Sequence, residues 1–241
     1  MTNTQKTAIV TGASQGIGAA LVEAFLKRGY NVVANSQNIT KANPFSASAN
    51  LALVDGDIGD PKTAARIVDT AVSRFGRIDV LINNAGVFIP KPFTDYTTED
   101  FNALVSTTLA GFLYVSQLSV KQMLRQKSGS IVNVSTTLVD HPIAGVQVSV
   151  QVMAKGSLNA VTRALAMEYA KDGIRVNTVA PSVIKTPMHK PETYEFLKEL
   201  QPLGRMGEIQ EVVDAVLFLT DATFTTGEIL HVDGGAHAGK W

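Results

Sequence analysis

Cysteine is absent from this 241-residue chain, and histidine is scarce, with four residues. The lack of thiols excludes disulfide bonds and thiol catalysis, and it is compatible with a reducing compartment. Charged residues make up only 17% of the chain, and 21 basic side chains balance 21 acidic ones. A chain without a basic excess has little with which to hold a phosphate backbone, so we expect no nucleic-acid partner.

Long apolar runs are also missing. We find no stretch that approaches the roughly 18 apolar residues needed by a membrane helix. The segment KTAIVTG (6–12) is already typical of a buried strand and the turn after it. A strand so near the start leaves no room for a cleavable leader. We therefore expect a cytoplasmic protein without a membrane partner.

What the chain does contain is 45% hydrophobic residues, arranged in short apolar runs that alternate with longer helical patterns. The runs lack period-2 alternation, as expected for strands covered on both faces. Strands are predicted at 7–10, 31–35, 51–54, 78–83, 130–135, 174–180 and 228–233. Helical patterns lie between the first run and Gly29, and near 61–75, 99–126, 150–172 and 208–220, whereas 36–50 is predicted to be a loop. This alternation predicts one α/β domain over 1–241, with a seven-stranded parallel sheet covered on both faces.

A glycine-rich turn, TGASQGIG (11–18), joins the first strand to the first helix. Gly12, Gly16 and Gly18 allow a tight turn and let backbone N–H groups approach a pyrophosphate, whose charge the helix N-terminus favours. Glycine turns without a ligand show similar spacing, but the strand before this one and the helix after it favour a dinucleotide site.

The end of the second strand bears on the choice of dinucleotide. Asn35 and Ser36 stand where a carboxylate often binds the adenosine ribose. No carboxylate is present there to repel a 2′-phosphate, and no arginine is present to bind one. NADP is therefore favoured, and NAD stays open.

Seven motifs in this order resemble the short-chain dehydrogenase/reductase family. Beside TGASQGIG they are, in chain order, DGDIGD (55–60), NNAG (83–86), SIVNVST (130–136), Lys155, RVNTVAPSVIKTPM (175–188) and GEILHVDGG (227–235). The resemblance implies a Rossmann-type, doubly wound sheet with helices on both faces and an NAD(P)-binding site, and no metal is predicted. The residues expected at the cofactor are Gly12, Ser14, Gln15, Gly16, Ile17, Gly18, Asn35, Ser36, Asp57, Ile58, Asn84, Ala85, Gly86, Lys155, Pro181, Ser182, Ile184 and Thr186.

The resemblance also implies a catalytic tetrad of Asn, Ser, Tyr and Lys, in which the tyrosine is the general acid or base. Lys155 fits the lysine, but Gln151 occupies the tyrosine position four residues earlier. Thr136 occupies the serine position and keeps the hydroxyl. The asparagine position, in VSTTLAG (105–111), is Thr108. The binding motifs are mostly kept, and the motif for proton transfer is not.

An amide at position 151 can donate a hydrogen bond to a substrate oxygen, but it gives up no proton at useful pH. A water or His141, on the loop after the hydroxyl-bearing strand, is expected to supply the proton, because histidine titrates near neutrality. Ser135 and Thr137 flank Thr136 and stay open as alternatives for its role.

We therefore expect an NAD(P)-dependent oxidoreductase that transfers hydride to or from a carbonyl, alcohol or imine. Two alternatives stay open: a dinucleotide-binding protein with little turnover, such as a sensor or partner subunit, and lyase-type chemistry in the same pocket. The expected pocket loops, 88–97, 138–150 and 185–202, carry few charges and predict a medium-sized hydrophobic substrate. The resemblance further implies a homotetramer built on the helices 99–126 and 150–172 and the last strand.

Overall fold

Seven parallel strands form one sheet in the computed structural model, which describes residues 5–42 and 44–239. The strands are β1 (Thr7–Thr11), β2 (Asn31–Ser36), β3 (Leu51–Asp55), β4 (Val80–Asn83), β5 (Gly129–Val134), β6 (Ile174–Pro181) and β7 (Ile229–Val232). Their order is β3-β2-β1-β4-β5-β6-β7. The chain changes direction across the sheet between β1 and β4, and the carboxyl ends of strands at such a switch point border the crevice in which these sheets bind ligands.

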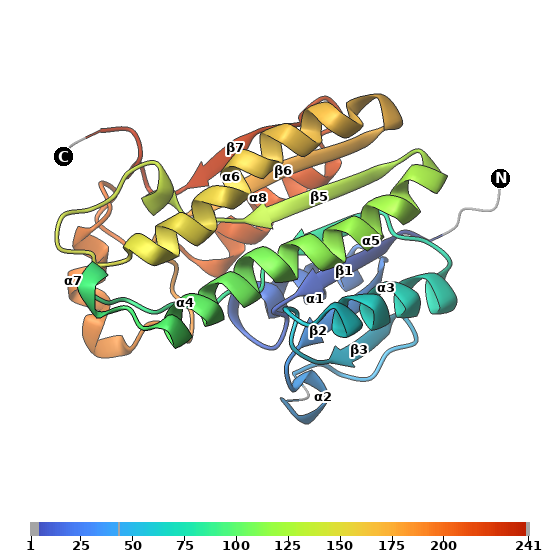
Figure 1. Ribbon diagram of the computed structural model, residues 1–241, viewed down its shortest axis with the longest axis horizontal. Helices are drawn as coiled ribbons and strands as arrows, with labels where there is room; N and C mark the ends of the chain where they lie inside the picture. The colour runs from blue at the N-terminus through green and yellow to red at the C-terminus, as the bar shows by residue number, and fades with distance from the viewer. Residues whose placement is uncertain (1–4, 43, 240–241) are drawn as a thin grey trace.

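Helices cover both faces of the sheet, as the alternating pattern predicts. They are α1 (Gly16–Lys27), α2 (Ile39–Ala42), α3 (Pro61–Phe75), α4 (Thr98–Val105), α5 (Gly111–Gln126), α6 (Ser149–Tyr169), α7 (Tyr194–Glu199) and α8 (Ile209–Asp221). In Figure 1, α3, α5 and α6 lie in front of the sheet, and α1 and α8 lie behind it. The doubly wound, seven-stranded parallel fold is confirmed.

Each face of the sheet has its own hydrophobic core, because successive strand residues point to opposite sides. Ala8 and Val10 of β1 pack with α1 and α8, whereas Ile9 between them packs with α3 and α5. The strands are buried on both faces, which explains why their sequences show continuous apolar runs.

Helix α3 shows how local sequence sets an element's bounds. The Asp60 side chain accepts a hydrogen bond from the N–H of Lys62, and Pro61 fills the first helical position. Gly76 ends the helix in a left-handed conformation, with φ at 79°. These signals are all readable in the sequence, and the predicted range of 61–75 is confirmed.

The helix predicted at 99–126 runs from Thr98 to Gln126, with a π-helical segment, Ser106–Ala110, between α4 and α5. Its mean hydropathy reaches 1.4, so by length and composition alone it is able to cross a membrane. This finding corrects the expectation that no stretch approaches such a length. The α5 part packs against α3 and the sheet, in the position of a core helix.

The sequence missed three further features. The polar stretch at 36–50 contains the short helix α2, and the expected pocket loop at 185–202 contains α7. Helices of four and six residues are too short to show a 3.6-residue period. Helix α6 ends at Tyr169 rather than at 172, because residues 170–172 tighten into a 3₁₀ turn before Gly173.

Candidate functional site

The predicted cofactor residues come together along the carboxyl ends of the strands. By element, Gly12, Ser14, Gln15, Gly16, Ile17 and Gly18 follow β1, Asn35 and Ser36 end β2, Asp57 and Ile58 follow β3, Asn84, Ala85 and Gly86 follow β4, Lys155 lies in α6, and Pro181, Ser182, Ile184 and Thr186 lie at the end of β6 and after it. Parallel strands place these ends on one rim of the sheet, so residues from most of the chain share one crevice.

The turn after β1 approaches its neighbours so closely that only glycine fits. A Cβ on Gly12, whose φ is 65°, would lie 2.7 Å from the Cα of Ala85. A Cβ on Gly18 would lie 2.2 Å from the carbonyl oxygen of Gly12. Helix α1 begins at Gly16 without a side-chain cap, so the N–H groups of its first turn can donate to an anion. This cradle fits the pyrophosphate of a dinucleotide.

Thr11 fixes the shape of that cradle, although it is not among the predicted site residues. Its Oγ1 accepts hydrogen bonds from the N–H groups of Asn84 and Ala85, each at 3.1 Å. The side-chain amide of Asn84 donates in turn to the carbonyl oxygens of Thr11 and Gly12, at 3.0 and 3.1 Å. The end of β4 is thereby locked to the phosphate turn. The sequence feature that could have indicated this role is the position of Thr11 at the end of a predicted strand.

The two predicted residues at the end of β2, Asn35 and Ser36, make different contacts. Asn35 is buried, and its Nδ2 donates to the carbonyl oxygens of Val54 and Gly56, at 2.9 and 3.1 Å. It therefore holds the ends of β2 and β3 together. Ser36 contacts Ser14 of the phosphate turn, with 3.0 Å between the two Oγ atoms. Neither of these side chains carries a charge.

The turn after β3 presents the predicted pair Asp57 and Ile58. The Asp57 carboxylate accepts from the N–H of Gly59 at 2.9 Å, which stabilises the turn. Ile58 is buried against α5, and a Cβ on Gly111 would lie 2.8 Å from its side chain. Gly111 is therefore needed to let the turn reach the helix.

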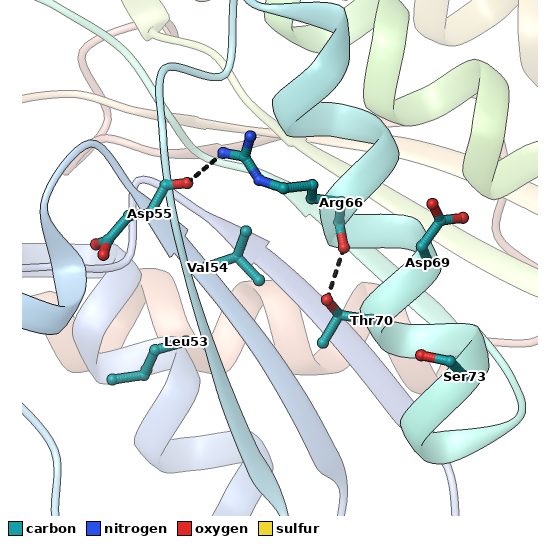
Figure 2. A pocket seen from close by; sticks show the side chains of 7 residues that line it. All are labelled: Leu53, Val54, Asp55, Arg66, Asp69, Thr70 and Ser73. Atoms are coloured by element: carbon teal, nitrogen blue, oxygen red, sulfur yellow. Dashed lines mark hydrogen bonds between the residues drawn. The ribbon is translucent and has the colours of Figure 1, made fainter.

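A pocket of about 580 Å³ lies behind this turn, between β3 and α3 (Figure 2). It is lined by Leu53, Val54, Asp55, Arg66, Asp69, Thr70 and Ser73. Arg66 reaches from α3 to the end of β3, where it donates to the carbonyl oxygen of Asp55 at 2.7 Å. The pocket opens at the outer edge of the sheet and contains no predicted site residue. Arg66 therefore braces the turn after β3.

The loop after β6 folds back over the phosphate turn. Ser182 donates from its N–H to the carbonyl oxygen of Val232 at 3.1 Å, which keeps the loop in line with β7. Ile184 pairs with Gly207 in an isolated bridge. Thr186 then reaches Gly16, where a Cβ would lie 3.6 Å from that of Thr186. The phosphate turn and the loop after β6, which are the first and last segments of the predicted cofactor site along the chain, are thus adjacent.

Lys155 is the buried cation of the site. Its Nζ donates to the carbonyl oxygen of Val134 at 2.6 Å, and the residue is 7% exposed. Burial lowers the pKa of Lys155 to about 8. A Cβ on Gly86 would lie 3.3 Å from Nζ, so the glycine makes room for the ammonium. Lys155 and the NNAG segment therefore face one another.

Gln151 lies one turn before Lys155 on α6 and is 6% exposed. Its Oε1 is buried and has no hydrogen-bond partner among the described residues. Buried amide oxygens are rarely left unpaired, so this acceptor is unusual. An amide carries no transferable proton at useful pH, so the side chain can offer hydrogen bonds only.

The structure separates the three adjacent hydroxyls after β5. Ser135 is buried and donates to the carbonyl oxygen of Lys155 at 3.3 Å. Thr137 is buried and donates to the Asp233 carboxylate at 2.8 Å. Thr136 is half-buried, and its Oγ1 accepts only a long, 3.4 Å contact from the N–H of Leu138. Of the three hydroxyls, that of Thr136 is the one whose O–H donates to no acceptor among the described residues.

Thr108 lies in the π-helical segment, a feature that is frequent at functional sites. Its Oγ1 is buried without a partner among the described residues. It borders a cavity of about 10 Å³, which Thr11, Asn83 and Thr107 also line. A volume of about 10–15 Å³ holds one water when polar partners surround it.

His141 lies exposed on the loop after β5, with its ring edge-on to His237 and 6.3 Å between the ring centroids. His237 in turn is hydrogen-bonded to Asp233 at 2.8 Å. The proposed role of His141 as a proton source stays a prediction.

A buried polar network under the site was also missed. Asn83 donates to Ser116 Oγ at 3.1 Å and to Asn133 Oδ1 at 2.9 Å. Asn133 donates to Thr162 Oγ1 at 2.9 Å, which lies 2.7 Å from Thr178 Oγ1. The network joins β4, β5 and β6 to α5 and α6 just below the carboxyl ends. The sequence feature that could have indicated this network is the presence of single polar residues inside otherwise apolar strands.

A doubly wound sheet of this order, with a glycine-lined phosphate turn at its switch point, defines the class of dinucleotide-binding α/β proteins. The family described as Enoyl-(Acyl carrier protein) reductase matches residues 12–237. The chain belongs to the short-chain dehydrogenase/reductase family and is an NAD(P)-dependent oxidoreductase.

Individual relatives span almost the whole chain. The putative ketoacyl reductase 2 of the granaticin polyketide synthase from Streptomyces violaceoruber is 36% identical, over 95% of each chain. The structure of ElxO with NADP bound has a TM-score of 0.90 at 29% identity and covers 98% of this chain and 100% of its own. A 3-ketoacyl-(acyl-carrier-protein) reductase from Brucella melitensis, complexed with NADH, also has a TM-score of 0.90, at 28% identity, over 96% of this chain and 98% of its own.

Proposed function

We propose that this oxidoreductase interconverts a medium-sized, largely hydrophobic carbonyl or imine compound and its reduced product, with a proton supply that does not use a tyrosine. The observation that carries the proposal is the pair of Lys155 and Gln151, a buried ammonium and a buried unpaired amide oxygen one helical turn apart. The family resemblance assigns the general acid to position 151, where an amide cannot serve.

The cofactor proposed is NADP, with NAD as the alternative. In this proposal the pyrophosphate lies in the glycine cradle, and the nicotinamide half lies beside Lys155 and Thr186. Ser14 and Ser36 carry no negative charge that would repel a 2′-phosphate at the adenosine end. When bound in its reduced form, the nicotinamide supplies the hydride.

Two side chains orient the substrate oxygen in this proposal. Thr136 donates from its half-buried hydroxyl, and the Gln151 amide donates from Nε2, as an oxyanion-hole amide does. Gln151 lies one helical turn from Lys155, whose positive charge would stabilise negative charge on a substrate oxygen bound there.

Lys155 is the proposed proton source for carbonyl substrates. With a pKa lowered to about 8 by burial, its ammonium is protonated at neutral pH and is a stronger acid than an exposed lysine. It is favoured over the exposed His141 because it is inside the site. After each transfer, water must return a proton to Nζ before the next turnover.

Imine reduction is the second candidate, and Gln151 is the residue that favours it. Reduction of an iminium ion gives a neutral amine directly, so a missing general acid costs little there. For a ketone the loss of a positioned acid lowers the rate by about 10²–10⁴.

The test follows NADPH absorbance while the protein meets a panel of hydrophobic ketones and cyclic imines. We expect turnover with at least one substrate, and loss of that turnover in Lys155→Met. NADPH binding without any turnover would favour the low-turnover dinucleotide-binding interpretation. Consumption of substrate without a change in NADPH would favour lyase-type chemistry.

The protein is further proposed to act as a cytoplasmic homotetramer. Apolar side chains stand exposed on the outer faces of α5 and α6, among them Leu113 at 45%, Met153 at 57% and Met167 at 82%. Rows of exposed apolar residues on two long helices support a contact between copies of the chain.

A further inference from the structure

The turn that carries Thr136 is tied to a segment almost a hundred residues away. Residues 231–237, named the C-terminal strap here, contain a buried carboxylate, Asp233. Its Oδ2 accepts from Thr137 Oγ1 at 2.8 Å, and from the N–H and Nδ1 of His237 at 2.9 and 2.8 Å. Its Oδ1 accepts from the N–H of Gly235 at 3.0 Å. Both carboxylate oxygens are therefore engaged.

A second tie joins the far end of the same turn to the strap. The Asp140 carboxylate lies 3.1 Å from Nε2 of His231, and its other neighbour is the Asn159 amide of α6 at 3.5 Å. The rings of His231 and His237 stack with 4.0 Å between their centroids. The two ties thus brace each other.

The strap also touches the other loops that border the crevice. Val232 accepts from the N–H of Ser182, at the start of the loop that folds over the phosphate turn. Gly234 accepts from the N–H of Leu203 at 3.2 Å, beside α7. One short segment therefore fixes three loops at once, and Asp233 is the side chain at its centre.

Hydrogen bonding and stacking are the chemistry of these imidazoles. Across residues 5–42 and 44–239, no group of three His, Cys, Asp or Glu side chains is arranged to hold a metal ion. Burial raises the pKa of Asp233, but hydrogen bonds from Thr137 and His237 outweigh it, so the pKa lies below its ordinary value. The carboxylate is charged at neutral pH and keeps its donors.

We propose that Asp233 is a positioning residue for the reduction, acting through Thr137 on the hydroxyl of Thr136. The proposal rests on the proposed function, in which that hydroxyl orients the substrate oxygen. The main chain of Thr137 accepts from the N–H groups of Asp140 and His141, so its side-chain anchor holds the whole turn. Without the anchor, the turn keeps its main-chain hydrogen bonds, such as that from the N–H of Val139 to the Thr136 carbonyl oxygen, and the Thr136 hydroxyl keeps only its long contact to Leu138.

The first experiment compares Thr137→Val, which has nearly the same shape but no donor, with Thr137→Ser, which keeps the donor. We expect Thr137→Val to lower kcat about tenfold to a hundredfold, because small displacements of a positioned group cost that much. NADPH affinity is expected to stay within about twofold, since the phosphate cradle is untouched. Thr137→Ser should restore kcat.

Thr220→Val is the matched control. Thr220 is 7% exposed and donates to the carbonyl oxygen of Val216 within α8, so the change removes a buried threonine hydrogen bond away from the crevice. It should leave kcat within about twofold. An equal loss of kcat in Thr137→Val and Thr220→Val would overturn the proposal, as would an unchanged kcat in Thr137→Val.

Hydrogen–deuterium exchange separates this proposal from the proposed function, because it requires no substrate. Exchange at residues 136–141 is expected to be at least about tenfold faster in Thr137→Val than in the parent, and normal in Thr137→Ser. If the parent turns over nothing but exchange responds in this way, the proposed function fails and the anchoring role of Asp233 stands. If the parent is active and exchange is unchanged in Thr137→Val, the positioning role is wrong.

Discussion

Lys155 and Val134 are joined by a 2.6 Å hydrogen bond from the buried ammonium to a main-chain oxygen. The acceptor is neutral, and burial alone lowers the pKa of the lysine to about 8. An ammonium so placed would stabilise a phenolate one helical turn away. Gln151 stands there instead, so the charge acts on no phenol. The chemistry of residue 151 and that of Lys155 are therefore separable by substitution.

Replacing Gln151 by tyrosine restores a phenol in a site that is already prepared for one. We expect kcat/KM for a hydrophobic ketone with NADPH to rise at least about tenfold. The gain should stay below the full general-acid effect of about 10²–10⁴, because Thr108 stands where the family resemblance implies an asparagine. Steady-state kinetics of parent and variant give the measurement.

Gln151→Phe is the control for this change, since it adds the ring without the hydroxyl. It should gain nothing. A Gln151→Tyr variant that folds and binds NADPH, yet reduces ketones no faster than the parent, would show that proton transfer does not limit the parent.

The pKa of Lys155 predicts a pH dependence of the reduction. If its ammonium supplies the proton, kcat falls about tenfold per pH unit above a pH of about 8 and is flat below it. The profile is measured at saturating NADPH between pH 6 and pH 10, a range chosen as roughly two units on either side of the pKa. A profile that stays flat throughout would remove Lys155 from the role of acid.

Stability supplies an independent check on the same group. The ordinary lysine pKa of 10.5 is lowered to about 8 on folding, so between these values the unfolded chain binds more protons than the folded one. The free energy of unfolding therefore gains from Lys155 as pH rises through this window. Relative to Lys155→Met, the cofactor-free parent should gain in Tm between pH 8 and 10.5. A constant difference in Tm would contradict the burial of the charge.

Gly12 and Gly29 separate steric contact from backbone strain. Both have positive φ, at 65° and 78°, but a Cβ on Gly29 meets nothing within 4 Å, whereas one on Gly12 meets Ala85 at 2.7 Å. Gly29→Ala should lower the free energy of unfolding by about 1–2 kcal/mol and leave NADPH affinity unchanged. Gly12→Ala should in addition weaken NADPH binding at least about tenfold, because the phosphate turn must move. Equal NADPH affinities in the two variants would argue against a cradle at this turn.

The proposed tetramer predicts a mass near four times 25.7 kDa by light scattering. Met167→Glu places a charge on a side chain that is 82% exposed and should dissociate the assembly without unfolding the chain. Phe224→Glu, at a fully exposed residue outside α5 and α6, is the comparison for a charge placed elsewhere. A monomeric parent would refute the proposal.

The sequence predicted those parts of the molecule that local chemistry determines. Asp60, Pro61 and Gly76 mark the bounds of α3. The glycines of the phosphate turn indicate its shape and favour a dinucleotide as its ligand. All seven strands lie where apolar runs predict them, and their bounds differ by one or two residues at most.

The rest depends on contacts between distant residues. Thr137 and Asp233 are 96 positions apart, and nothing in either segment announces the other. The choice among Ser135, Thr136 and Thr137 likewise needed the fold, because each hydroxyl has the same chemistry and only its partners distinguish it. Helix α7 was missed since six residues carry too little pattern.

The Asn83–Asn133 pair has a consequence for how the chain folds. Parallel strands made of similar apolar residues can pair in shifted registers at little cost in burial. In any shifted register of β4 and β5, the Asn133 Oδ1 would lose its donor Asn83 inside the core, at a cost of about 1–3 kcal/mol. The Asn83–Asn133 hydrogen bond therefore favours the native register of β4 and β5. The native register also brings Asn84 to Thr11. Asn83→Leu would then be expected to yield misaligned, slowly refolding protein before it yields an inactive enzyme.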